Sequence, residues 1–228
     1  MTHEDDDVQT EPVLGLPERP PEGERILWQG APAWRGLAWR AFGVRLVALY
    51  FGVLVVWRLA EGVATGVPVT ELMFGVVVLL LQGLAAAGVL ALMAYAAAKA
   101  TIYTITTKRV AMRIGVALTV TLNLPHRWTG SAALRQFSDG TGDLPLALTG
   151  QTRLAYLMLW PHVRPWRLAR AEPALRAVPE AGHVAEILAR ALRDAAEDRA
   201  RAETPAPQPE PAPAAATPAT PATLVPAE

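Results

Sequence analysis

Cysteine is absent from this 228-residue chain, and neither sign of charge is in excess. The lack of thiols excludes disulfides, thiolate catalysis and cysteine-ligated zinc or iron–sulfur sites. The 21 Lys and Arg residues match the 21 Asp and Glu residues, and the pI is about 6.9. Because a balanced charge provides no general attraction to phosphate backbones, we expect no nucleic-acid partner.

The sequence also has little that could carry catalysis or hold a cofactor. None of the four histidines, His3, His126, His162 and His183, stands at metal-ligand spacing from another histidine or from carboxylates. We expect them to be surface or turn residues. No P-loop, dinucleotide fingerprint or nucleophile elbow occurs, and Gly140-Thr-Gly142 is too short to cradle a phosphate. We therefore predict a protein that is not an enzyme and uses no cofactor.

Charged residues are missing from one long stretch, between Leu72 and Ala98. A helix rises ~1.5 Å per residue, so this stretch is long enough to cross a hydrocarbon core of ~30 Å. Gln82 is almost its only strongly polar side chain, whereas a core helix of a soluble protein normally carries a polar stripe. We predict a transmembrane helix over about residues 72–98.

A second apolar run is shorter and is centred on Gly52, with Arg45 and Arg58 near its ends. Long guanidinium side chains can reach the headgroups from such positions. We predict a first transmembrane helix over about residues 41–60, joined to the second by the Gly- and Pro-punctuated segment 61–70. A single-pass or re-entrant arrangement is the alternative.

Basic residues flank both ends of this predicted hairpin and are rare in its connection. The positive-inside rule therefore places both termini in the cytoplasm. We predict that Trp39, Arg45 and Trp57 lie at the membrane surface, because indole rings and long basic side chains favour the headgroup boundary.

A basic group made of Lys108, Arg109 and Arg113 follows the second predicted span. Such a group can contact anionic headgroups, at about 1 kcal/mol per charge near the surface. The alternative is that these residues express only the ordinary positive-inside bias.

Small residues recur at helical spacing in the second span. Gly83, Ala87 and Ala91 follow one another every four residues, and Ala94 and Ala98 add a second pair. Small side chains let another helix approach closely. Part of this face must serve the first span, and the rest could dock a helix of another protein or of a second copy.

Beyond residue 100 the pattern changes to alternation of β-branched or apolar residues with polar ones. It predicts strands over residues 101–106, 110–114, 118–124, 133–137, 143–148, 154–159 and 166–169. Asp139-Gly140 predicts a type I′ hairpin turn. A helix is predicted over about residues 180–200, where Val184, Leu188 and Ala191 share one apolar face.

These elements divide the chain into four parts. We predict a disordered acidic tail over 1–21, a membrane domain with its preceding segment over 22–99, a β domain over 100–201 and a disordered Ala- and Pro-rich tail over 202–228. The fold class is therefore an α+β membrane protein. Its transmembrane helical hairpin carries a small cytoplasmic sandwich or barrel capped by a helix.

Several motifs resemble those of a known family. Glu22-Gly-Glu-Arg-Ile-Leu-Trp-Gln-Gly-Ala-Pro32, Tyr103-Thr-Ile-Thr-Thr-Lys-Arg-Val110 and Gly140-Thr-Gly-Asp143 resemble segments of bacterial pleckstrin-homology-like (PH-like) membrane proteins. With Leu124-Pro-His-Arg-Trp128 and Leu159-Trp-Pro-His-Val-Arg-Pro-Trp166, the pattern is similar to the photosynthetic complex assembly proteins of purple bacteria.

That resemblance implies about seven strands capped by one helix, on the cytoplasmic side of the inner, or intracytoplasmic, membrane. It also implies a factor that helps to build the photosynthetic reaction centre and its core antenna (LH1) by binding their subunits, and it does not imply lipid-specific binding. Membrane lipids are expected partners because of the two predicted spans. The alternative is a generic membrane-anchored PH-like module that binds a lipid surface or envelope proteins.

Overall fold

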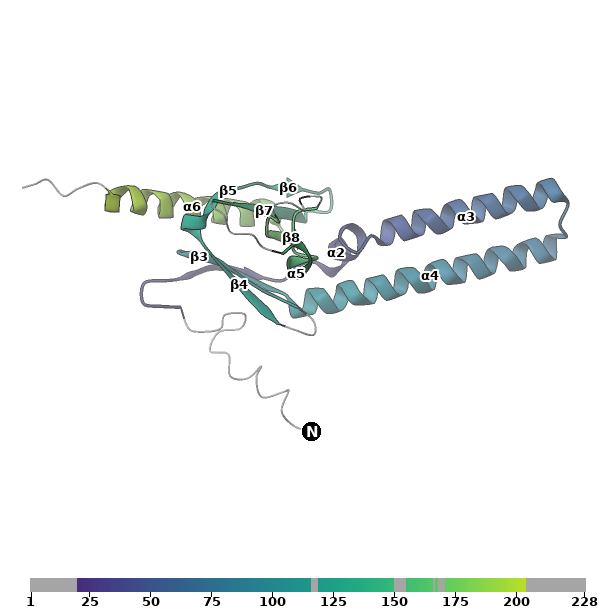
Figure 1. The fold of residues 1–228 in the computed structure, drawn as a ribbon, viewed down its shortest axis with the longest axis horizontal. Helices are drawn as coiled ribbons and strands as arrows, with labels where there is room; N and C mark the ends of the chain where they lie inside the picture. Colours follow the sequence, from purple (N-terminus) through teal and green to yellow (C-terminus); the bar gives the residue numbers. More distant parts are fainter. Residues whose placement is uncertain (1–19, 116–118, 150–154, 166, 168–170, 204–228) are drawn as a thin grey trace, which may run out of the picture.

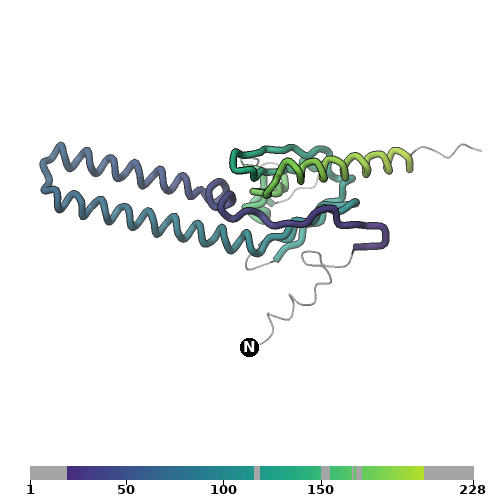
Figure 2. Tube along the Cα trace, turned by 180° about the vertical axis from the view of Figure 1, so that it is seen from behind, coloured from purple at the N-terminus to yellow at the C-terminus, as the bar shows by residue number. Residues whose placement is uncertain are grey.

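The computed structural model describes residues 20–115, 119–149, 155–165, 167 and 171–203. The expected tails and the expected strand at 166–169 lie wholly or mostly outside these residues. Figures 1 and 2 show a long helical hairpin that projects from one end of a β domain. The C-terminal helix runs along the β domain, and its last turns project beyond the end opposite the hairpin.

Two long helices, α3 (Val44–Thr65) and α4 (Val69–Ala100), form the hairpin, and both are long and apolar enough to span a membrane. The connection is shorter than the predicted 61–70, because α3 continues to Thr65. Gly66 then ends it in a left-handed conformation with φ of 68°, which glycine adopts without steric cost. Pro68 follows as the N-cap of α4.

The first sheet has the order β1 (Ile26–Gly30), β2 (Ile102–Thr106), β3 (Arg109–Ile114), β4 (Val120–Pro125), and all its neighbours are antiparallel. Strand β1 precedes the hairpin and β2 follows it. The structure therefore places residues 26–30 in the β domain, whereas the sequence-based boundary assigned them to the membrane domain. That boundary is corrected because β1 pairs with β2, which follows both long helices in the sequence.

The second sheet is built around β7 (Gly142–Leu148), which pairs with β5 (Thr129–Ala132), β6 (Arg135–Gln136) and β8 (Ala174–Val178). The described residues thus form eight strands, against about seven expected. The strand predicted over 154–159 is wrong for its described part. Residues Tyr156–Leu159 form a short helix, α5, in which the Leu159 amide donates to the Ala155 carbonyl at 3.3 Å and the Trp160 amide to the Tyr156 carbonyl at 3.0 Å.

The turn at Asp139-Gly140 is present, but it is not type I′. Only Gly140 has a positive φ, of 77°, whereas type I′ requires positive φ at both central residues. The Gly140 amide donates to the Phe137 carbonyl at 3.1 Å, and the Phe137 amide donates to the Thr141 carbonyl at 2.8 Å. A longer loop closed by a left-handed glycine therefore joins β6 to β7.

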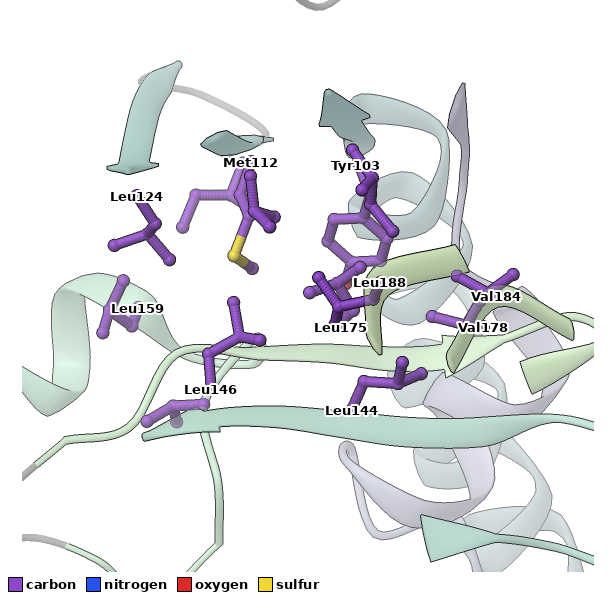
Figure 3. Packing of buried hydrophobic residues seen from close by; sticks show 14 of the residues in the cluster. Tyr103, Met112, Leu124, Leu144, Leu146, Leu159, Leu175, Val178, Val184 and Leu188 are labelled. Carbon is purple, nitrogen blue, oxygen red and sulfur yellow. The ribbon is translucent and has the colours of Figure 1, made fainter. Parts of the chain in front are cut away.

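The two sheets face each other across the main hydrophobic core, which the C-terminal helix α6 (Ala181–Glu203) closes. In Figure 3, Met112 and Leu124 of the first sheet point toward Leu146 of the second. Val184 and Leu188 of α6 reach the same core. The helix predicted over 180–200 is confirmed, and its apolar face covers the open end of the sandwich.

Candidate functional site at the junction of hairpin and β domain

A short helix, α2 (Trp34–Arg40), fixes the hairpin to the β domain. Its Leu37 and Ala38, with Phe42, form a second buried cluster with small residues of α4 and β8, namely Ala94, Ala97, Ala98 and Ala177. The Ala33 amide before α2 donates to the Ala177 carbonyl at 2.8 Å. The hairpin base is therefore packed into the β domain and does not hang from a flexible linker.

A chain of buried hydrogen bonds continues this junction below the end of α4. The Thr101 hydroxyl donates to the Ala97 carbonyl at 2.7 Å, so the Nε2–H of His162 donates to Thr101 Oγ1 at 3.0 Å. The Tyr103 hydroxyl donates to His162 Nδ1 and accepts the Arg176 amide at 3.2 Å. The Thr101 and Tyr103 hydroxyls each donate one hydrogen bond and accept another, so the direction of every bond in this network is fixed.

Burial sets the protonation states of His162 and Tyr103. Desolvation of the ring, with a smaller effect of the Arg176 charge, lowers the pKa of His162 to about 3. Desolvation also raises the pKa of Tyr103 well above its usual range. Both groups are neutral at physiological pH, and both ring nitrogens of His162 are already bonded. This network of hydrogen bonds therefore holds the end of α4, β2 and β8 together with the turn after α5, and it is not poised to transfer a proton.

A buried ion pair lies next to this chain. Arg176 Nε is 3.0 Å from Asp143 Oδ2, and Arg176 Nη1 donates to the Val163 carbonyl at 3.0 Å. Asp143 Oδ1 accepts the Ala177 amide at 2.9 Å. The pair thus joins β7, β8 and the loop that follows α5.

Two hollows open beside the junction. An apolar one of about 260 Å³ is lined by Met93, Ile114, Trp160 and their neighbours. A larger one of about 620 Å³ lies between the start of α3, the β6–β7 hairpin and the loop after α5, and its walls carry several arginines. In the part of the chain that the structure describes, no group of three His, Asp or Glu residues is placed to hold a metal ion.

Most of the predicted small-residue face packs against other helices of the same chain. Ala94 and Ala98 are buried under α2. Gly83 faces Phe51 of α3, and Ala87 and Ala91 continue its row and are half-buried. Docking of a foreign helix on these residues stays a prediction. The exposed apolar side chains of α4, such as Leu84 and Leu92, lie elsewhere on the helix.

Gly83 provides a test of the hairpin packing. A Cβ on Gly83 would lie 2.8 Å from the Phe51 ring, whereas Gly88 has no atom within 4 Å. We expect Gly83→Leu to lower hairpin stability by about 1–3 kcal/mol through overpacking, and Gly88→Leu to have little effect. Unfolding midpoints of the purified variants in mild detergent compare the two, and equal midpoints would contradict this packing.

The predicted membrane-surface residues fall into three places. Trp39 and Arg45 are exposed near the hairpin base, and Trp57 is exposed toward its far end. Their contact with lipid stays a prediction. The basic group expected after the second span is not a cluster, because Ile102, just after α4, pairs with Arg113 while Lys108 and Arg109 lie beyond the other end of β2. Arg113 is therefore separated from Lys108 and Arg109 by roughly 15 Å along β3, at ~3.4 Å per residue.

The family-like motifs have structural roles. The buried carboxylate of Glu24 accepts the Thr106 hydroxyl at 2.7 Å and Arg109 Nε at 2.9 Å, which ties β1 to the β2–β3 turn. In the Gly-Thr-Gly-Asp turn, Gly142 packs so closely that a Cβ would lie 2.5 Å from that of Ala181. These motifs therefore mark the residues that hold the domain and its hairpin together.

Sequence reasoning missed most of the junction. The expectation that His126 and His162 are surface residues is wrong, because both are buried. His162 does lie in a turn, where its amide donates to the Leu159 carbonyl. His126 Nε2 donates to the Thr106 carbonyl at 2.9 Å. His183 is exposed as expected, and His3 lies outside the described residues. The only sequence signal for the junction was the set of motifs that contain Tyr103, His162 and Asp143.

This geometry defines a class of protein: a two-sheet domain closed by one helix and mounted on an apolar helical hairpin, with two hollows beside the junction. The chain matches the model of the bacterial PH domain family over residues 33–192, and it belongs to that family.

A relative from Rhodobacter capsulatus, described as an uncharacterized 23.7 kDa protein in the puhA 5′ region, is 39% identical over 193 residues. The match covers 82% of this chain and 88% of the relative. The crystal structure of a DUF1696-family protein with a pleckstrin-homology domain from Shewanella loihica is 12% identical. It covers 40% of this chain and 68% of its own, with a TM-score of 0.27, which is too low to bear on the fold.

Proposed function

We propose that this protein is a non-enzymatic assembly factor for the photosynthetic reaction centre and its LH1 antenna, of the PuhB kind that its sequence resembles. The observation that carries the proposal is the relative that is 39% identical and is described by its position beside the photosynthesis gene puhA. Because that relative matches over 88% of its length, hairpin and β domain are shared and not the β domain alone.

The hairpin supports a location in the inner membrane. The apolar windows of α3 and α4 are almost entirely unburied within the chain. Side chains such as Leu84, Leu92 and Val56 would meet water in a soluble protein, at a cost of about 1.5–3 kcal/mol each. A bilayer removes that cost. With the hairpin in the bilayer and both termini cytoplasmic, the β domain lies at the cytoplasmic face.

The rigid junction supports a scaffold role. A domain fixed to its hairpin presents the exposed faces of α3 and α4 to membrane helices, and it presents the β domain to the cytoplasmic parts of the same subunits. Exposed Leu84 lies on such an outward face, whereas Ala94 is covered by α2. The reaction-centre or LH1 subunits are the proposed partners, and a second copy could use the same face.

A deletion strain of a photosynthetic host tests the proposal. We expect membranes from this strain to lose near-infrared absorbance of the reaction centre and LH1, while transcript levels of their subunits stay unchanged. The intact gene restores both bands. A photo-crosslinking residue at Leu84 should capture a subunit, and one at Ala94, as the matched buried control, should not.

Normal absorbance in the deletion strain would reject the assembly role and favour a generic membrane-anchored PH-like module. Loss of absorbance together with lost transcripts would also reject it, since the protein would then act on expression. Capture from Ala94 as efficient as from Leu84 would count against contact through the outward face.

A further inference from the structure

The larger hollow at the hairpin base is strongly basic. Five arginines line it, and they come from five different elements: Arg40, Arg45, Arg135, Arg164 and Arg176. Asp143 is its only acidic lining residue among those that the structure describes. A concave surface of this size with converging guanidinium groups is suited to a phosphate, because guanidinium binds phosphate oxygens in pairs.

Three of these arginines are already partly neutralised. Arg40 pairs with Asp139 at 3.0 Å, Arg164 with Glu172 at 2.9 Å, and Arg176 with Asp143. Arg45 and Arg135 are exposed and take part in none of the ion pairs among the described residues. The Arg135 guanidinium lies over the Phe137 ring, 5.4 Å from its centroid, and so keeps its charge. The Arg40 Nε atom is buried without a hydrogen-bond partner. Five guanidinium groups therefore share three carboxylates, which leaves positive charge for an anionic ligand.

The hollow also has an apolar wall on the side of the hairpin. Leu46 in the first turns of α3, Tyr156 of α5 and Trp160 line it. The Trp160 ring lies edge-on to Phe42, with centroids 4.8 Å apart, so this wall is fixed to the hairpin base. Next to it, Leu157 is 86% exposed and Met158 is 60% exposed. Apolar surface therefore continues from the outward faces of the spans to the rim of the hollow.

The depth of the hollow fits the headgroup layer of the proposed bilayer. A hydrocarbon core of ~30 Å takes about 20 helical residues. With Glu71 and Glu61 outside the core at the far turn, a core that begins at Leu72 ends near Leu92 on α4. Phe42 packs in one cluster with Leu90 and Ala94, so the start of α3 lies at that level. Arg40 and Arg45, which lie two and three residues from Phe42 in the sequence, are therefore near the end of this core, where the layer of lipid phosphates begins.

We propose that this hollow binds the phosphate headgroup of an anionic membrane phospholipid, with Arg45 and Arg135 as its free charges and with the acyl chains lying along Leu46 and Trp160. The inference rests on the membrane location in the proposed function, and it adds a lipid ligand at a defined site. A bound lipid would join α2, α3 and the β6–β7 hairpin, and would so stiffen the junction from its outer side.

The full chain, purified in a zwitterionic detergent, tests this site. We expect short-chain phosphatidylglycerol to raise the melting temperature of the chain more than phosphatidylcholine does, since a ligand that binds only the folded state stabilises it. The double variant Arg45→Gln/Arg135→Gln should lose this additional rise. Arg193→Gln, an exposed arginine on α6, is the matched control and should keep it.

Both arginines of the double variant are exposed, so its melting temperature without lipid and its recovery in the membrane fraction should equal those of the unchanged chain. Equal rises with the two lipids, or an undiminished rise in the double variant, would overturn the proposal. A full rise with inorganic phosphate alone would also overturn it, because the ligand would then be a free anion. None of these results depends on reaction-centre assembly, so the deletion strain judges the proposed function separately.

Discussion

Replacing Asp143 with alanine is expected to lower the free energy of unfolding of the β domain by about 3–5 kcal/mol, the usual cost of leaving a buried charge unpaired. Asp143 neutralises Arg176 at 3.0 Å and accepts the Ala177 amide at 2.9 Å. Both side chains are almost fully shielded from solvent. Removing the carboxylate therefore strands a guanidinium and a backbone amide inside the junction. Chemical denaturation of the detergent-solubilised protein measures the loss.

Asp139 offers a matched control on the same β6–β7 hairpin. It pairs with Arg40 at 3.0 Å, but its side chain is exposed. Asp139 also accepts the Thr141 amide at 3.1 Å, and the side chain of Arg40 is only 13% exposed. We expect Asp139→Ala to cost about 1–2 kcal/mol, less than Asp143→Ala, because its carboxylate keeps contact with solvent. If the two alanine variants unfold at the same denaturant concentration, the Arg176–Asp143 pair does not anchor the junction.

Acid is expected to destabilise the β domain through His162. Its folded pKa of about 3 lies below the ordinary value of 6.5, because the buried neutral ring is desolvated and already hydrogen-bonded. Between these two values the unfolded chain binds a proton that the folded chain does not, so stability falls as pH falls below 6.5. Each pH unit costs about 1.4 kcal/mol, which amounts to about 2 kcal/mol between pH 6.5 and pH 5.

His126 adds to the same trend, because desolvation also lowers its pKa. The variant His162→Gln isolates the main contribution, since glutamine does not titrate and can still donate to Thr101 and accept from Tyr103. We expect its stability, measured by thermal unfolding at pH 7 and pH 5, to change less than that of the unchanged chain. If the unfolding temperatures of the two proteins fall by the same amount between pH 7 and pH 5, His162 is not held neutral by burial.

The sequence predicted helices and strands well where one hydrophobic pattern extends over the whole segment. Uncharged apolar runs located α3 and α4, alternation located β2, β3 and β7, and an amphipathic pattern located α6. Strand β1 was missed because Ile26–Gly30 is a largely exposed edge strand without alternation. Strand β8 was missed because Arg176 interrupts its apolar pattern. Arg176 can be buried there because it pairs with Asp143, which lies 33 residues earlier in the sequence.

The candidate site was less predictable than the fold. Histidines beside prolines are typical of turns, and nothing local to His162 reveals that Thr101 and Tyr103 come to lie on either side of its ring. The basic hollow could not be found from the sequence either, since its five arginines are spread from residue 40 to residue 176. In contrast, three basic residues close together in sequence are spread along a strand, with Lys108 and Arg109 at the start of β3 and Arg113 near its end.

Strand β1 lies before the hairpin and β2 after it, yet the two are neighbours in one sheet. In the proposed topology, β1 and β2 meet on one side of the bilayer because α3 crosses it and α4 returns. A chain whose second span stalls would leave β1 and β2 on opposite sides of the membrane. In that topology, completion of the sheet would report on the pairing of the two spans: the cytoplasmic surface that would receive partners would not form on molecules in which only one span has crossed.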